Sequence, residues 1–67
     1  MGATFNADEV LGMAEQIERN GRAFYLAAAQ KYPDLAKLLL DLAAMEQEHI
    51  KTFATMRTEL SSSEVEP

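Results

Sequence analysis

Residues 38–53 read LLLDLAAMEQEHIKTF, and their pattern predicts the main element of the fold. It contains no proline or glycine, and most of its residues are good helix formers. Its apolar residues recur three and four positions apart, which is the spacing of one face of an α-helix. The complete stripe comprises Leu35, Leu38, Leu39, Leu42, Ile50, Phe53, Met56 and Leu60. The pattern predicts one long amphipathic helix over about residues 33–60.

Glu46 and His49 interrupt this stripe near its middle. On a helix that turns by about 100° per residue, both side chains project from the apolar face. A buried carboxylate without a partner costs several kcal/mol, which is comparable with the whole stability of a small domain. A divalent cation bound by both residues would compensate, because side chains three positions apart converge on one helical face. The alternative is a metal-free polar layer that sets the register of the helices.

A second helix-forming segment covers residues 7–31. Asn6 and Glu9 match a capping box, which predicts that the helix begins at residue 7. Glu18 lies at the edge of its apolar stripe. Gly21 lies on the stripe at a cost of roughly 1 kcal/mol of helix propensity relative to alanine, which suggests close helix approach. The stripe consists of Val10, Ala14, Ile17, Gly21, Phe24 and Ala28.

Pro33 separates the two helices, because proline ends the first and suits the first turn of the second. So short a connection makes the helices antiparallel neighbours. The sequence therefore predicts an all-α fold: one domain over residues 1–67, built as an antiparallel helical hairpin with a polar tail at 61–67. A lone hairpin leaves one side of each stripe uncovered. We expect a second copy of the chain, or a companion helical hairpin, to complete a four-helix bundle.

Composition narrows the class of protein. A chain of 67 residues buries only about 60% of its unfolded surface, so a bound metal or oligomerisation is expected to stabilise it. The net charge of −5 argues against partners such as nucleic acid or an anionic membrane surface. No cysteine, signal peptide or membrane-spanning run is visible, and we expect a cytoplasmic protein.

Two segments resemble the first two helices of the rubrerythrin-type, ferritin-like di-iron carboxylate proteins. They are residues 15–25, EQIERNGRAFY, and residues 40–49, LDLAAMEQEH. In such bundles two helices each supply one glutamate, and two others each supply Glu-x-x-His. The resemblance implies half of a ferritin-like bundle with Glu18, Glu46 and His49 as metal ligands. It also implies a hydrogen bond from Tyr25 to a ligating carboxylate, and no catalytic residues beyond the ligands.

Two such hairpins, as a homodimer, would hold two Fe ions, or else Mn or Zn. The resemblance implies an oxidoreductase that oxidises Fe(II) with O2 or peroxide, as a ferroxidase or a rubrerythrin-like peroxidase. Its role would then be iron handling or peroxide detoxification. Family members usually carry four bundle helices in one chain, so this chain is either a natural half-size protein or the front of a longer one. Two alternatives stay open: a metal-free helical dimerisation module with a buried Glu/His layer, and a Zn or Mn site without redox activity.

Overall fold

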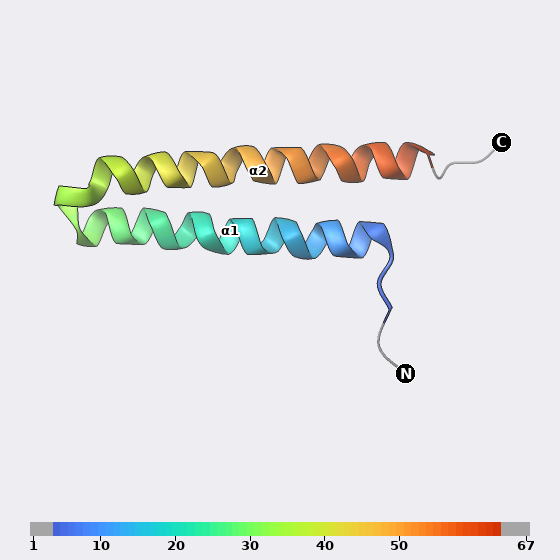
Figure 1. Cartoon of the computed structure of the whole chain (residues 1–67), viewed down its shortest axis with the longest axis horizontal. Coiled ribbons are helices and arrows are strands. Elements are labelled where there is room, and N and C mark those ends of the chain that lie inside the picture. Colours follow the sequence, from blue (N-terminus) through green and yellow to red (C-terminus); the bar gives the residue numbers. More distant parts are fainter. Residues whose placement is uncertain (1–3, 64–67) are drawn as a thin grey trace.

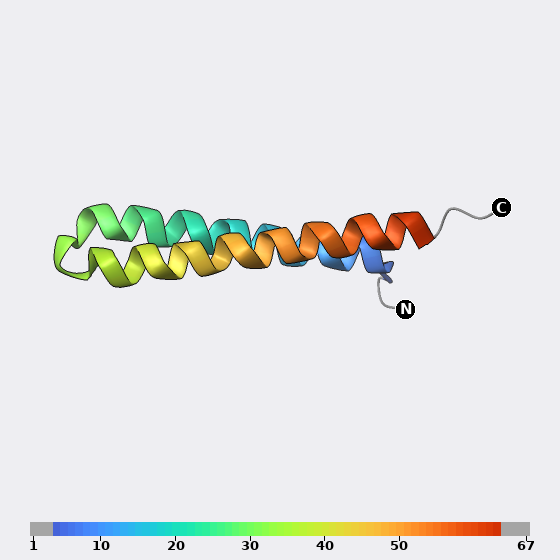
Figure 2. The same ribbon diagram turned by 90° about the horizontal axis from the view of Figure 1, so that it is seen from above.

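The computed structural model describes residues 4–63, which form two α-helices joined by a single turn (Figure 1). Helix α1 spans Ala7–Lys31 and helix α2 spans Ala36–Ser63. The helices run antiparallel and side by side, and the view from above in Figure 2 agrees with this arrangement. The predicted all-α helical hairpin is therefore confirmed.

Helix α1 begins with the capping box that the sequence predicts. The Asn6 side chain accepts a hydrogen bond from the Glu9 backbone N–H at 2.8 Å, and the Glu9 carboxylate accepts one from the Asn6 N–H at 3.0 Å. These bonds satisfy backbone donors that the first helical turn cannot satisfy internally. The helix ends at Lys31, and the Tyr32 N–H closes its last turn on the Ala28 carbonyl at 2.8 Å.

The second helix differs from its predicted bounds at both ends. Its first turn, η1 (Pro33–Leu35), is a 3-10 turn rather than α-helix, closed by the Leu35 N–H on the Tyr32 carbonyl at 2.9 Å. At the other end α2 continues through Ser63, beyond the predicted boundary at residue 60. Serine is only a weak helix breaker, and no glycine or proline follows before Pro67, so the predicted tail begins later. Residues 64–67 of that tail lie outside the described residues.

The hairpin is a single layer of helices. Its principal extents are 55 × 31 × 11 Å, and its radius of gyration is 15.8 Å, whereas a compact chain of this length has about 11 Å. Among the described residues only Ala29, Ala43 and Ile50 are buried, all between the two helices. Two packed helices thus enclose only a small core.

The two broad faces of the hairpin differ in chemistry. One, here called the apolar face, carries the outward part of both apolar stripes. Its large side chains stay exposed, including Ile17 at 67% and Leu38 at 57%. Even so, within residues 4–63 neither helix has an apolar stretch as long as a membrane crossing requires. The apolar face consists of Val10, Ala14, Ile17, Gly21, Phe24 and Ala28 of α1 and Leu38, Leu42, Met45, Phe53 and Met56 of α2, around Glu46 and His49.

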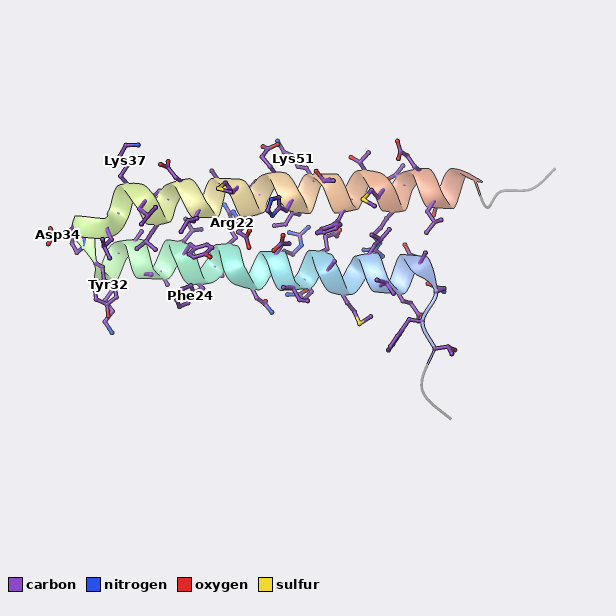
Figure 3. The ribbon with its side chains drawn as sticks, viewed as in Figure 1. Arg22, Phe24, Tyr32, Asp34, Lys37 and Lys51 are labelled. Atoms are coloured by element: carbon purple, nitrogen blue, oxygen red, sulfur yellow. The ribbon has the colours of Figure 1, made fainter. Side chains whose placement is uncertain are left out.

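The opposite face, here called the polar face, is lined by charged side chains. Arg57 of α2 lies over Gly12 and donates from Nε to Asp8 Oδ1 at 2.9 Å. Its Nη1 also lies 3.5 Å from Glu15 Oε2, so one guanidinium joins the start of α1 to the end of α2. The outer edge of α2 is charged as well, because Figure 3 shows Lys37 and Lys51 projecting from it in the direction away from α1. This face is therefore suited to water.

Candidate metal centre

Three side chains converge between the two helices, about half-way along the hairpin. Glu18 of α1 and Glu46 and His49 of α2 each offer a ligand atom, and these atoms all lie within 4.8 Å of one another. His49 Nδ1 lies 2.7 Å from Glu18 Oε2 and 3.3 Å from Glu46 Oε1. The first distance is that of a strong hydrogen bond between charged or partly charged groups.

Local helix geometry explains why these side chains meet. Glu46 and His49 are three residues apart on an uninterrupted helix, so they project from one face. The antiparallel turn at Pro33 folds α1 back along α2, which brings Glu18 to the same level. Each helix holds its ligand by an ordinary α-helical backbone, and no residue among those described has a positive φ. The site is thus set on rigid elements rather than loops.

The three side chains are not equally exposed. Glu18 and Glu46 retain only 20% and 17% of their side-chain exposure, because both lie between the helices. His49 remains 48% exposed on the apolar face. The carboxylates are therefore partly shielded from water within the hairpin, while the imidazole projects outwards from the apolar face.

The electrostatics of the site concentrate on Glu46. Partial burial raises the pKa of the Glu46 carboxyl above its ordinary value, and the adjacent Glu18 carboxyl raises it further. His49 opposes both effects but does not cancel them. Two carboxylates held this close repel each other, so the pair favours either a shared proton or a cation.

The donor set suits a hard or borderline divalent cation. Carboxylate oxygen and imidazole nitrogen are ligands of Fe(II), Mn(II) and Zn(II), and no soft sulfur ligand lies among the three residues. A cation between the three donors would take the place of the proton that His49 shares with Glu18. The three residues that the sequence predicts as ligands therefore lie together in an arrangement that fits such a cation, and their role as ligands stays a prediction.

Tyr25 lies two turns beyond Glu18 on α1 and is half-buried. Its ring packs edge-on against Phe24, with 5.6 Å between the ring centroids. Within residues 4–63 its hydroxyl makes no hydrogen bond to a carboxylate of the site. The expected bond from Tyr25 to a ligand stays a prediction for an assembled bundle, in which carboxylates from another hairpin could reach it.

Comparison with known proteins agrees with the geometry of the site. The sequence profile of the Rubrerythrin family matches residues 9–67, which include α2, all but the first two residues of α1, and all three candidate ligands. The chain belongs to the Rubrerythrin family. Membership in this ferritin-like, di-iron carboxylate family is consistent with the helical hairpin and with its Glu/His group. No curated protein and no solved structure matches the chain significantly.

Two features of this rubrerythrin hairpin are not predicted by the sequence patterns. The Arg57 cluster joins Arg57 to Asp8 and Glu15, residues more than 40 positions away in the chain. The second feature is the neighbour of Gly21, which is the Glu46 carboxylate rather than the backbone of α2. Periodicity identifies the face on which a residue lies, but the pairing of residues across two helices depends on their register.

Proposed function

We propose that this chain binds iron through Glu18, Glu46 and His49 and, as a pair of hairpins, oxidises Fe(II) with O2 or peroxide. The convergence of these three donors within 4.8 Å carries the proposal. Membership in the Rubrerythrin family supports it, because that match extends across both helices.

Each ligand has a distinct role in this proposal. Glu46 has the lowest side-chain exposure of the three, at 17%, and its carboxylate would serve as the bridging ligand. Glu18 and His49 then act as terminal ligands from opposite helices. Iron bound there supplies the one-electron chemistry, while the protein fixes the positions of the ligands and limits access of water.

The proposed reaction balances without any group from the protein. Two Fe(II) ions each lose one electron to become Fe(III). A molecule of peroxide accepts the two electrons and, with two protons, yields two waters. With O2 as the oxidant, the same two electrons and two protons yield hydrogen peroxide. The oxidant and the Fe(II) come from solution, and the residues of the chain serve as ligands only.

We further propose that a second copy of the chain covers the apolar face. One hairpin supplies two glutamates and one histidine, whereas the di-iron bundles of this fold use four glutamates and two histidines. Two copies meeting on their apolar faces would supply that set. The same contact would enclose His49 and the exposed side chains of Ile17 and Leu38, whose burial favours association.

The charge of the ligands makes this association dependent on metal. Four glutamates brought to one interface repel one another, and their desolvation adds to the cost. Divalent cations between them remove both penalties. Metal binding and assembly should therefore favour each other, since a ligand that binds only the assembled form stabilises it.

The experiment that tests this function compares two glutamates of α2. Glu46→Ala removes a proposed ligand. Glu48→Ala, the matched control, removes an exposed carboxylate that pairs with Lys51 at 3.5 Å. After anaerobic loading with Fe(II), ferric absorbance is followed upon addition of O2 or peroxide. We expect Glu46→Ala to abolish oxidation while circular dichroism shows retained helicity, and Glu48→Ala to oxidise at the parent rate.

Equal rates for the parent and Glu46→Ala would contradict the assignment. A parent protein whose thermal stability is the same with Fe(II) and with chelator would instead indicate the metal-free dimerisation module. Metal-dependent stability with no oxidation would indicate a Zn or Mn site without redox activity.

A further inference from the structure

Gly21 of α1 lies directly against the carboxylate of Glu46. A Cβ atom built on Gly21 with ideal geometry would lie 2.6 Å from Glu46 Oε2, and 3.6 Å from its Cδ. Non-bonded carbon and oxygen atoms do not approach to 2.6 Å. Any residue other than glycine therefore conflicts with the observed position of this carboxylate.

The cost of glycine at this position needs an explanation. In the interior of a helix, glycine is about 1 kcal/mol less favourable than alanine. Gly21 lies well inside the 25-residue helix α1, and its backbone is ordinary α-helix, so no positive φ requires it. The neighbour that a Cβ would meet is the Glu46 side chain, and no atom of the α2 backbone lies among the nearest three.

The position of Gly21 relative to Glu18 indicates why the space beside Gly21 matters for the site. Gly21 follows Glu18 by three residues, so both lie on adjacent turns of the same side of α1. The Glu18 carboxylate extends towards His49, and its Oε2 lies 2.7 Å from His49 Nδ1. One turn later, the missing side chain of Gly21 lets Glu46 lie against α1 and within reach of the same point. This segment of α1 thus supplies one proposed ligand, Glu18, and leaves the space for a second, Glu46.

We infer that Gly21 is a positioning residue. Its missing side chain leaves the space against α1 that the Glu46 carboxylate needs in order to take up the metal-binding arrangement. This inference rests on the proposed role of Glu46 as a ligand. The obstructed group is the end of a flexible side chain, so Gly21→Ala displaces the carboxylate and leaves the backbone of the hairpin in place.

Gly12 provides a matched control on the same helix. A Cβ built on Gly12 would lie 3.4 Å from Arg57 Nη1, which is an ordinary van der Waals contact. Gly12→Ala and Gly21→Ala therefore make the same chemical change in the interior of the same helix. They differ in whether the added methyl group meets Glu46.

The first test uses the metal-free full chain, in EDTA at one fixed protein concentration, and compares melting temperatures. Gly12→Ala should raise Tm by about 4–8 °C through helix propensity. Gly21→Ala should raise it by clearly less. In a Glu46→Ala background, where no carboxylate is present, Gly21→Ala should recover the full increase, while Gly12→Ala gives the same increase in both backgrounds.

The second test measures Mn²⁺ binding by isothermal titration calorimetry. Gly21→Ala should raise the dissociation constant by roughly 10- to 100-fold, the usual effect of disturbing the support of a ligand. Gly12→Ala should bind Mn²⁺ as the parent does. If parent and Gly12→Ala fail to bind Mn²⁺, the proposed function is wrong, and the melting comparison still decides the role of Gly21. If Gly21→Ala gains as much Tm as Gly12→Ala with Glu46 present, or binds Mn²⁺ like the parent, the role of Gly21 is overturned.

Discussion

At Glu46, the side chain that would suit metal binding is not the one that would best stabilise the metal-free hairpin. Its carboxylate is 17% exposed and lies beside Glu18, and both facts raise its pKa. An ionised carboxylate in that position destabilises the metal-free hairpin. The same enclosure makes it a strong ligand once a cation is present, because fewer water molecules compete for it. Residues that serve a site in this way commonly reduce the stability of the fold.

Replacing Glu46 with glutamine separates the two effects. Glu46→Gln keeps the shape and the hydrogen-bonding capacity of the side chain but removes its charge. At pH 7 the metal-free variant should melt at a higher temperature than the metal-free parent, while losing the increase in Tm that Mn²⁺ gives the parent. Differential scanning calorimetry with EDTA and with excess Mn²⁺ measures both. A metal-free variant that melts below the parent would show that the carboxylate stabilises the hairpin.

At the scale of single residues, the sequence predicts which residues form the site better than it predicts which residues contact one another. Glu46 and His49 are identifiable because polar residues on an apolar stripe require a partner, and Glu18 becomes identifiable only beside them. The pairing of Gly21 with Glu46 is different. It depends on how far α1 is displaced along α2 and on the rotamer of one side chain, neither of which leaves a periodic signal in the sequence.

At the scale of elements, two kinds of contact hold the helices together. Between the helices, small or branched side chains pack closely, with Ala29, Ala43 and Ile50 almost completely buried. At the open end, the guanidinium of Arg57 joins α2 to Asp8 in the first turn of α1. An acidic residue there also interacts favourably with the positive end of the helix dipole. The Arg57 contact restrains the helix ends that the turn at Pro33 does not reach.

The Asp8–Arg57 contact predicts a defined pH dependence. The hydrogen bond from Arg57 lowers the pKa of Asp8 from its ordinary value of 3.8. A carboxylate with a lowered pKa adds stability above its unfolded pKa, and that stability is lost as the pH falls through the folded pKa. The difference in free energy of unfolding between the parent and Asp8→Asn should thus be present at neutral pH and vanish as the pH falls below about 3.8.

Urea titrations of both proteins at several pH values measure this difference. In an Arg57→Ala background, Asp8→Asn should change stability little at any pH, because its main partner is gone. An undiminished effect of Asp8→Asn in that background would show that the helix dipole, rather than Arg57, accounts for the contribution of Asp8.

The sequence predicts the start of α1 more accurately than the end of α2. The capping box of Asn6 and Glu9 is a local motif, and its predicted geometry is confirmed by both of its hydrogen bonds. The end of α2 has no comparable motif. Three serines after Leu60 are polar without being strong helix breakers, and the helix continues through them to Ser63.

At the scale of the whole molecule, the hairpin is one layer with two unlike faces. The polar face carries the Arg57 cluster, whereas the apolar face exposes large side chains around the candidate metal centre. Amphipathic helices need cover on their apolar side. A second copy in that place would enclose the metal centre and complete a four-helix bundle.

Two substitutions of exposed aliphatic residues, one on each face, test this arrangement. Ile17 is 67% exposed on the apolar face, and Leu40 is 50% exposed beside Arg22 and Gln47 on the polar face. Ile17→Glu would place an unpaired charge in the proposed interface and should raise the dissociation constant of the Mn²⁺-loaded dimer by at least about 100-fold. Leu40→Glu should leave it unchanged. Sedimentation equilibrium measures both, and equal effects would place the interface elsewhere.

The iron content of the chain tests whether Glu18, Glu46 and His49 form a metal centre. The full chain is loaded with Fe(II) under anaerobic conditions, desalted, and its iron and protein are quantified by elemental mass spectrometry. Two irons shared by two hairpins predict about one iron per chain, with Glu46→Ala retaining almost none. Iron near zero in the parent, at a protein concentration where the chain is folded, would contradict the proposed metal centre.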